Sequence, residues 1–225
     1  MTLANTSTMI VGGSGAMGSA VARHVDRLGG AVVLVGRNRA RLGAAAGGLD
    51  RARVVVGDFT AEDDARRVAD EVGVVDHVVV ALSAGSAASS VTATAPETFR
   101  EVHGRLWASY HAVHLASGLV RPGGSVVLVS GSSGRRPVAG FGVWTSLYGA
   151  IEALARAAAL ELAPVRVNVV SPGGIGLPPD RQLVERAGEP GDIGQAVTAL
   201  MVNPAITNAV LDVDGGERLG TWYGG

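Results

Sequence analysis

Short hydrophobic runs rich in β-branched residues alternate along the chain with longer stretches of helical periodicity. Several runs are apolar at every position instead of at alternate ones, as in Val54-Val55-Val56 and Val78-Val79-Val80. Strands show this pattern when helices cover both faces of a parallel sheet. The pattern therefore predicts seven buried strands, at residues 9–11, 31–35, 53–56, 74–80, 125–129, 165–170 and 206–213.

The stretches between these runs have the spacing of amphipathic helices, most clearly at Ile151, Leu154 and Ala158. Strict alternation of strand and helix predicts right-handed crossovers and a doubly wound sheet. We therefore expect a single Rossmann-type α/β domain over residues 1–225, with a seven-stranded, mostly parallel sheet and helices on both faces. A loop is expected at 81–95. Helices are expected at residues 16–28, 39–47, 61–72, 96–119, 143–162 and 192–202.

The composition narrows the classes of function. The formal net charge is −1, with 19 Lys and Arg against 20 Asp and Glu, so the basic excess typical of a nucleic-acid-binding protein is missing. The absence of cysteine excludes disulfides, thiolate catalysis and Cys-ligated zinc, and it fits a cytoplasmic protein. The first residues lack the pattern of a signal peptide, and no apolar run approaches the ~20 residues of a membrane span. We expect neither a nucleic-acid nor a membrane partner.

A glycine-rich turn, Gly12-Gly13-Ser14-Gly15-Ala16-Met17-Gly18, connects the first predicted strand to the first helix. Gly13, Gly15 and Gly18 match the Gly-x-Gly-x-x-Gly spacing of dinucleotide-binding folds. A diphosphate must approach bare backbone N–H groups at a helix N-terminus, and a Cβ atom there would hold it away. The turn follows the first strand of a βαβ unit and therefore predicts a dinucleotide site. The alternative is a glycine-rich surface turn.

The end of the second predicted strand indicates which dinucleotide binds. An acidic residue about 20 positions after the glycines would bind the ribose 2′-hydroxyl of NAD. This chain has Gly36-Arg37-Asn38-Arg39 there, without an acid, and a guanidinium can bind the additional 2′-phosphate of NADP. We therefore predict NADP(H) in preference to NAD(H). The alternatives are that these arginines are solvated residues at a helix start, and that no cofactor binds.

Four motifs together resemble those of the short-chain dehydrogenase/reductase family. They are the turn at 11–18, with Ala16 in place of the family's middle glycine, the Gly36-Arg37-Asn38 ending, the Arg-Val-Asn-Val-Val-Ser-Pro-Gly at 166–173 and the Leu-Asp-Val-Asp-Gly-Gly at 211–216. The resemblance covers nearly the whole chain. It implies a Rossmann-type fold and an oxidoreductase that acts on a carbonyl or an alcohol.

The resemblance also implies which residues contact the cofactor. Asp58 and Phe59, which close the third strand, would cover the adenine edge, and Ser83-Ala84-Gly85 would lie beneath the adenine ribose. The turn after the sixth strand would add further contacts. The complete set is Gly12, Ser14, Gly15, Met17, Gly18, Arg37, Asn38, Asp58, Phe59, Ser83, Ala84, Gly85, Pro172, Gly173 and Ile175.

The family's catalytic residues are not kept at the matching positions. The resemblance implies a Tyr-x-x-x-Lys pair on the fifth helix, a serine thirteen residues before that tyrosine, and an asparagine on the fourth helix. In the family the tyrosine is the general acid/base, the lysine lowers its pKa and binds the nicotinamide ribose, the serine orients the substrate carbonyl, and the asparagine holds a proton-relay water. The corresponding positions here hold Trp144, Tyr148, Gly131 and Arg105, in that order.

These replacements predict an altered mechanism. An indole N–H does not exchange a proton near neutral pH, so Trp144 cannot serve as an acid or a base. Tyr148 lacks the lysine that would lower its pKa from about 10, and losing positioned acid–base help slows a reaction by about 10²- to 10⁴-fold. A substitute catalytic set would comprise Ser130 or Ser132, together with Tyr148 and Arg105. The alternative is that Trp144 fills the catalytic hollow and the other residues have structural roles.

Other signals are weaker. His111 and His114 could share one helix face, but no third ligand stands out, so no metal site is predicted. His77 is expected at the surface. The segment 174–190 is short for a substrate lid and has room only for a short helix at 180–186. It would leave an open cleft, or one closed by a neighbouring subunit.

The resemblance implies an oligomer formed through the fourth and fifth helices. Alanines of the fifth helix, such as Ala153 and Ala157, are small enough for close contact, and the tail residues Trp222-Tyr223 favour burial. We predict a homotetramer, with a homodimer as the alternative. The leading function is an NADP(H)-linked oxidoreductase with an altered active site and a small-molecule substrate. The alternatives are a non-catalytic descendant that senses cofactor or serves as a structural subunit, and a lyase or isomerase without net redox change.

Overall fold

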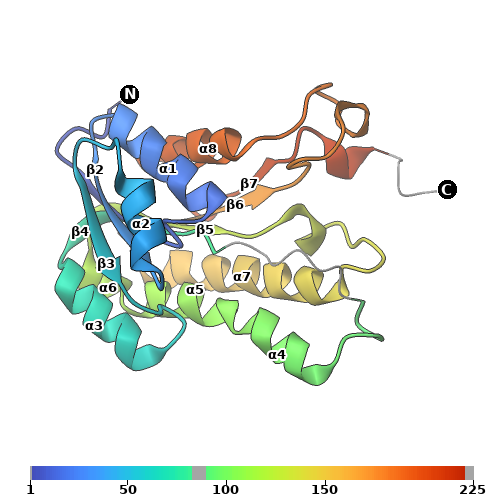
Figure 1. Cartoon of the computed structure of the whole chain (residues 1–225), viewed down its shortest axis with the longest axis horizontal. Helices are drawn as coiled ribbons and strands as arrows, with labels where there is room; N and C mark the ends of the chain where they lie inside the picture. Colours follow the sequence, from blue (N-terminus) through green and yellow to red (C-terminus); the bar gives the residue numbers. More distant parts are fainter. Residues whose placement is uncertain (1, 83–89, 221–225) are drawn as a thin grey trace.

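The predicted hydrophobic runs form one sheet in the computed structural model, which describes residues 2–82 and 90–220. The strands are β1 (Ser7–Val11), β2 (Ala31–Gly36), β3 (Ala52–Val56), β4 (Val75–Val80), β5 (Val120–Val129), β6 (Arg166–Pro172) and β7 (Val210–Val213). Their order is β3-β2-β1-β4-β5-β6-β7, and every neighbouring pair is parallel (Figure 1). The doubly wound sheet is confirmed, and it is parallel throughout instead of mostly parallel.

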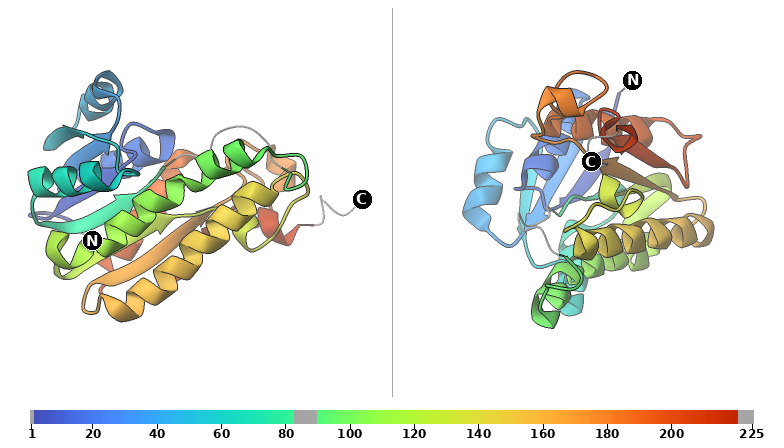
Figure 2. Two further views of the ribbon diagram at one scale, coloured as in Figure 1. Left: turned by 90° about the horizontal axis from the view of Figure 1, so that it is seen from below. Right: turned by 90° about the vertical axis from the view of Figure 1, so that its right-hand side faces the viewer.

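Helices cover both faces of this sheet, as predicted. They are α1 (Ala16–Arg27), α2 (Arg39–Ala46), α3 (Glu62–Val72), α4 (Pro96–His103), α5 (Arg105–His114), α6 (Ala116–Leu119), α7 (Gly142–Glu161) and α8 (Pro190–Val202). Three short 3₁₀ turns lie in the described part of the chain: η1 (Ser132–Gly134), η2 (Pro179–Arg181) and η3 (Glu217–Leu219). α1, α2 and α8 pack on one face, whereas α3, α5 and α7 pack on the other (Figures 1 and 2).

The structure departs from the predicted elements in four places. β5 begins at Val120, five residues before the strand expected at 125–129. The helix expected at 96–119 is divided into α4, α5 and α6, and Gly104 lies at the first break, because glycine loses the most backbone freedom in a helix. β7 is shorter than the strand expected at 206–213, since Asn208 adopts φ 57° just before it. The helix expected at 180–186 is only the 3₁₀ turn η2, which begins in a pair of prolines.

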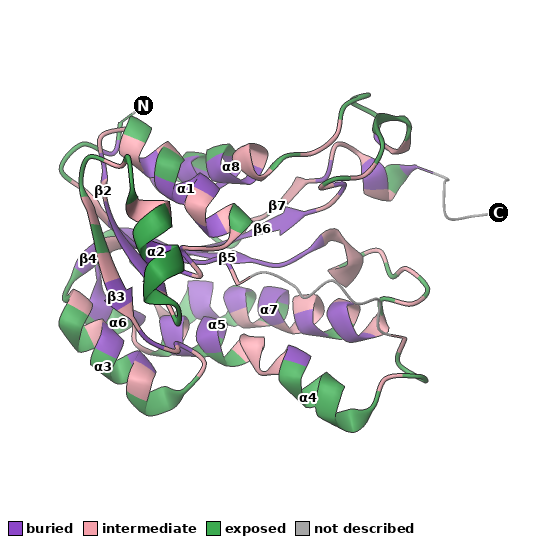
Figure 3. Cartoon of the chain, viewed as in Figure 1, coloured by how far each residue is buried: buried purple, intermediate pink, exposed green. Residues whose placement is uncertain are grey.

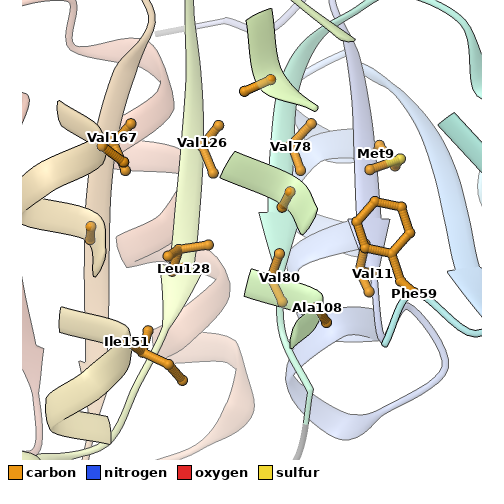
Figure 4. Close-up of a cluster of buried hydrophobic side chains, with 14 of the residues drawn as sticks. Met9, Val11, Phe59, Val78, Val80, Ala108, Val126, Leu128, Ile151 and Val167 are labelled. Carbon is orange, nitrogen blue, oxygen red and sulfur yellow. The ribbon is translucent and has the colours of Figure 1, made fainter. Parts of the chain in front are cut away.

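Two hydrophobic cores lie between the sheet and the helices, one on each face of the sheet. Met9, Val78, Val126 and Val167 come from four neighbouring strands and belong to the core that α5 and α7 cover (Figure 4). A second core lies on the opposite face, beneath α1 and α8. The outer faces of α3 and α4 are exposed (Figure 3). Burial on both sides of the strands explains why their valine runs are apolar at consecutive positions.

The Arg-Val-Asn motif of β6 has a structural role. The Arg166 side chain, 8% exposed, donates hydrogen bonds to the last carbonyl oxygens of α8 and to that of Ile206, at 2.7–2.9 Å. The Asn168 side chain donates to the same Ile206 oxygen at 2.9 Å and accepts from the Ala209 N–H at 3.0 Å. The motif therefore joins β6 to the end of α8 and to the segment that leads into β7.

His77 lies in the interior, so the expectation of a surface position is wrong. It belongs to β4, is 6% exposed, and its Nδ1 lies 2.9 Å from the Ser125 hydroxyl on β5. Burial lowers the pKa of His77 to about 4; the Asp76 carboxylate opposes this change and the Arg166 charge adds to it. The folded chain therefore holds this imidazole neutral.

We expect His77 to make the fold sensitive to acid. The unfolded chain protonates this histidine near pH 6.5, so its contribution is complete above that pH and is lost as the pH falls toward about 4. The difference amounts to about 3 kcal/mol of unfolding free energy. Urea unfolding at both ends of this pH range should show less acid destabilisation in His77→Gln than in the wild type. His114→Gln, at an exposed position, is the control, and equal acid sensitivity in all three proteins would contradict the prediction.

Candidate active site

A cleft of about 570 Å³ opens at the carboxyl ends of β1, β2, β3 and β4. Doubly wound sheets bind their ligands where the strand order reverses, and this sheet reverses between β1 and β4. The cleft therefore lies where this fold holds a ligand. Of the cofactor residues expected from the sequence, those that line it are Gly12, Ser14, Gly15, Arg37, Asn38, Asp58 and Phe59.

The glycine turn of this cleft has no room for side chains at its two ends. Gly12 adopts φ 82°, and a Cβ atom there would lie 2.5 Å from the Ala81 carbonyl oxygen. A Cβ atom on Gly18, in the first turn of α1, would collide with the Gly12 carbonyl oxygen. Because α1 begins at Ala16, its first backbone N–H groups have no helical acceptor and are available to an anion. Met17 packs against the core under α1 instead of lining the cleft.

Two arginines place positive charge at the rim of the cleft. Arg37 follows β2, and its guanidinium lies 3.9 Å from the Asp58 carboxylate. Arg41, on α2, reaches the glycine turn, where its Nη2 lies 3.5 Å from the Ser14 carbonyl oxygen. Arg39, which the sequence also offered at this strand end, does not line the cleft, whereas Arg41 in the first turn of α2 does.

The other residues expected around the adenine have partners within the protein. Asn38 caps α2 through its side-chain oxygen. Asp58 accepts hydrogen bonds from the N–H and the hydroxyl of Thr60, at 3.0 and 2.6 Å. Phe59 is 2% exposed and belongs to the core in Figure 4, so little of its ring reaches the cleft. Ser83, Ala84 and Gly85 lie outside the described residues.

The site narrows next to Arg105, which begins α5 and lines the cleft. Its guanidinium lies 5.5 Å from the centre of the Trp144 ring, a cation–π distance. Trp144 is 4% exposed, and the Tyr148 ring, one turn later on α7, lies 6.0 Å from it. The cavity that these three side chains border measures about 10 Å³, room for one water molecule at most. The side chains therefore fill the hollow that they surround.

Tyr148 contributes the phenol group that borders this hollow, and its protonation state decides what it can do there. Burial raises the pKa of Tyr148 to about 12, and the nearby positive charge of Arg105 opposes that rise. The hydroxyl is consequently protonated throughout the neutral pH range. It can donate a hydrogen bond or a proton, but it cannot act as a base there.

The two serines expected near the catalytic centre have different surroundings. Ser130 is 5% exposed and donates its hydroxyl to Glu152 Oε1 at 3.1 Å. The buried Glu152 also pairs with Arg135, with 3.4 Å between Oε2 and Nε. Ser132 adjoins the turn after β6, where a Cβ atom on Gly173 would lie 2.6 Å from its Oγ. Glu152 follows Tyr148 by one helical turn on α7 and was not among the residues expected from the sequence.

The turn after β6 is held by the protein itself. Pro172 is buried at the end of the strand, and the Gly173 N–H donates to the Val213 carbonyl oxygen at 3.0 Å. Ile175 is half-buried and packs against the core on the α8 side of the sheet. The structure therefore brings this turn next to Ser132 at the carboxyl ends of β5 and β6.

Two features are missing from residues 2–82 and 90–220. No three His, Asp or Glu side chains gather there in an arrangement that could hold a metal ion. No helix in these ranges has both the length and the apolar character needed to cross a bilayer.

Comparison with known proteins agrees with this arrangement. The chain matches the family model described as enoyl-(acyl carrier protein) reductase over residues 12–217. It is 30% identical to the short-chain dehydrogenase/reductase ATR9 of Stachybotrys chlorohalonatus, over 97% of this chain and 99% of that protein. It is also 30% identical to the human 3-oxoacyl-[acyl-carrier-protein] reductase, over 93% of this chain and 97% of that protein. A solved small-chain dehydrogenase in complex with NADPH has a TM-score of 0.82 and 24% identity, over 96% and 99% of the two chains.

The matches extend over nearly the whole chain, from the glycine turn to the segment after β7. The parallel sheet, the reversal of strand order beside the cleft and the glycine turn are features of the fold on which such enzymes are built. The resemblance that the sequence motifs indicated is therefore confirmed. The chain belongs to the short-chain dehydrogenase/reductase family of oxidoreductases.

Proposed function

We propose that the chain is an NADP(H)-linked oxidoreductase that reduces a carbonyl group of a small molecule through an altered active site. The open cleft at the reversal of strand order, with two arginines at its rim, carries this proposal. The human relative is named as a reductase of a 3-oxoacyl group, which supports a carbonyl substrate. The solved complex with NADPH supports the choice of cofactor.

The residues of the cleft fit the adenosine and diphosphate parts of this cofactor. The turn between Gly12 and Gly18 leaves backbone N–H groups of α1 open to a diphosphate, because a Cβ atom at either glycine has no room. Arg37 and Arg41 would hold the 2′-phosphate through charge-assisted hydrogen bonds. NADPH, when bound, supplies a hydride. The remaining task of the protein is to position the carbonyl and to provide a proton.

Tyr148 and Arg105 are suited to carbonyl reduction but not to the reverse reaction, the oxidation of an alcohol. The oxygen of a carbonyl group gains negative charge as it is reduced, and a protonated phenol beside a guanidinium stabilises this charge. Since burial holds the pKa of Tyr148 at about 12, its hydroxyl cannot remove a proton from an alcohol at neutral pH. We therefore expect carbonyl reduction to be faster than alcohol oxidation. Ser132, next to the turn after β6, would be a second hydrogen-bond donor to the substrate.

Replacing Arg37 and Arg41 by alanine should weaken the preference for NADPH over NADH. In Arg37→Ala/Arg41→Ala, we expect the Kd for NADPH to rise by about 10²- to 10⁴-fold, because each arginine loses a hydrogen bond to a charged group that contributes about 1.5–3 kcal/mol. The Kd for NADH, which lacks the 2′-phosphate, should change by less than about threefold. Titration followed by tryptophan fluorescence measures both. Arg39→Ala is the matched control on the same helix, outside the cleft lining, and equal losses for NADPH and NADH would contradict the assignment.

Turnover of a panel of ketones and aldehydes with NADPH tests the proposed activity. Loss of NADPH absorbance that depends on the carbonyl compound, with the alcohol as product, is the expected result. NADPH binding without turnover of any compound would favour the non-catalytic alternative. Product formation without consumption of NADPH would favour a lyase or an isomerase.

We also propose that the chain assembles as a homotetramer, with a homodimer as the alternative. α5 and α7 lie side by side (Figure 2) and form an apolar groove of about 410 Å³. Trp107, 55% exposed, and Tyr110, 41% exposed, stand on its α5 side, and Ala150 and Leu154 form its α7 side. Exposed aromatic rings of this kind are enriched in subunit interfaces.

Introducing a charge into this groove should separate the subunits. Trp107→Glu would bury a carboxylate without a partner if the α5 and α7 surfaces met in an oligomer, so we expect it to lower the mass measured by sedimentation velocity to that of a monomer. Val74→Glu is the control, because Val74 is also exposed but lies just before β4 and does not line the groove. A wild-type protein that sediments as a monomer at micromolar concentration would contradict the proposed assembly.

A further inference from the structure

Gly131 lies against the ring of Tyr148 and leaves no space between them. A Cβ atom at position 131 would lie 2.5 Å from Cε2 of Tyr148 and 2.8 Å from both Cδ2 and Cζ. These distances are well inside van der Waals contact, so a side chain at this position and the present ring cannot both be accommodated. Gly134, on η1, borders the start of the same side chain, since its Cβ would lie 2.9 Å from the Cβ of Tyr148.

The need for glycine at position 131 comes from this contact and not from the backbone. Gly131 adopts φ −170° and ψ 151°, an extended conformation that any residue can take. The residue is itself buried at the end of β5, where its neighbour Ser130 already gives its hydroxyl to Glu152. The ring of Tyr148 therefore occupies the place that a side chain from position 131 would take.

We infer that Gly131 is a positioning residue that seats the Tyr148 ring on the end of β5, and that the two residues act as one compensated pair. The inference rests on the proposed role of Tyr148 as the proton donor. Cζ, the ring atom that bears the hydroxyl, lies 2.8 Å from the position of the absent Cβ. The Tyr148 ring thus takes the space at the strand end that Gly131 leaves open, so these two departures from the family pattern have one physical cause.

Gly131→Ala tests this pairing directly. The added methyl group should push the ring out of its seat, so the pKa of Tyr148 should fall from about 12 toward the ordinary value of about 10. Ultraviolet absorbance of tyrosinate during an alkaline titration measures this change, and subtraction of a Tyr148→Phe titration isolates the Tyr148 signal. Gly149→Ala is the matched control, because a Cβ on this α7 glycine meets nothing within 4 Å and should leave the titration unchanged.

Steady-state kinetics provide the second readout. Gly131→Ala should lower kcat for carbonyl reduction by about tenfold or more, since the donor has moved, while the Kd for NADPH stays within about threefold. In a Tyr148→Phe background the same change should have no further effect on kcat, because the hydroxyl is already gone. The thermal unfolding midpoint of each variant establishes that it is folded.

The two readouts separate failure of the pairing from failure of the proposed function. A folded Gly131→Ala protein in which Tyr148 titrates as in the wild type would overturn the inference, whether or not the enzyme is active. If the pKa of Tyr148 falls in Gly131→Ala but the wild type turns over no carbonyl compound, the seating of the ring is supported and the catalytic role of Tyr148 is contradicted. Equal losses of kcat on adding Gly131→Ala to the wild type and to Tyr148→Phe would show that Gly131 acts independently of the phenol, which also overturns the inference.

Discussion

Tyr148→Phe is expected to lower the rate of NADPH-dependent carbonyl reduction by at least about 100-fold, because loss of a positioned proton donor slows such reactions by about 10²- to 10⁴-fold. The phenylalanine ring keeps the contact with Gly131 and fills the same space, so folding and NADPH affinity should change little. Only the hydroxyl is removed from the hollow between Arg105 and Trp144. Single-turnover measurement at saturating NADPH isolates the step concerned.

The pH dependence offers an internal check on the same residue. With its pKa raised to about 12 by burial, Tyr148 carries its proton across the whole neutral range, so its ionisation should not reduce the wild-type rate as the pH rises through that range. Tyr110→Phe removes an exposed hydroxyl from α5 and should retain the wild-type rate. Full activity in Tyr148→Phe would mean that Ser132 or a water molecule delivers the proton, and the proposed role of the phenol would be abandoned.

The sheet could be predicted from the sequence because strands that are buried on both faces are apolar at consecutive positions. Val54-Val55-Val56 and Val78-Val79-Val80 have no polar alternation, and the structure buries β4 between two layers of helices. The break in the helix at Gly104 could not be predicted from periodicity, since the apolar spacing continues across it and one glycine is compatible with a helix interior. His77 was expected at the surface because it is polar. It is buried because helices cover both faces of β4, which leaves no exposed side for a polar residue.

In the site, too, residues whose role depends on the local sequence could be predicted, whereas residues whose role depends on tertiary contacts could not. The glycine turn was predictable because Gly12, at φ 82°, and Gly18, against the Gly12 carbonyl, need the residue type itself. Arg41 and Glu152 were missed because their roles arise from contacts with distant segments, the glycine turn for the first and the end of β5 for the second. For Glu152, the spacing of four residues from Tyr148 on the same helix was an available signal.

Restoring the family's residues is expected to accelerate the reaction. The combined variant Gly131→Ser/Trp144→Tyr/Tyr148→Lys provides a hydroxyl on the strand end, a phenol at the family's acid/base position and a cation to lower the pKa of that phenol. We expect its kcat/KM for carbonyl reduction to exceed that of the wild type by about tenfold or more, because a phenol whose pKa lies nearer the working pH is the better acid catalyst. Replacing the large buried indole by a phenol also enlarges a cavity of only about 10 Å³ beside Arg105, which leaves more room for the substrate. Steady-state kinetics with a fixed ketone and saturating NADPH measure the gain.

The effect of Gly131→Ser should depend on which residue stands at position 148, so the effects of the substitutions should not be additive. Gly131→Ser alone should be harmful, because the new Cβ would lie 2.5 Å from the Tyr148 ring, whereas the same change should be tolerated once Tyr148→Lys has removed that ring. Gly131→Ser/Trp144→Phe/Tyr148→Lys, which opens the hollow equally but lacks the phenol, is the control for access alone and should remain slow. If the combined variant folds and binds NADPH but reacts no faster than the wild type, then the hollow at Trp144 is not where the carbonyl is reduced. The proton would then have to come from a group outside this hollow, such as Ser132 or a water molecule.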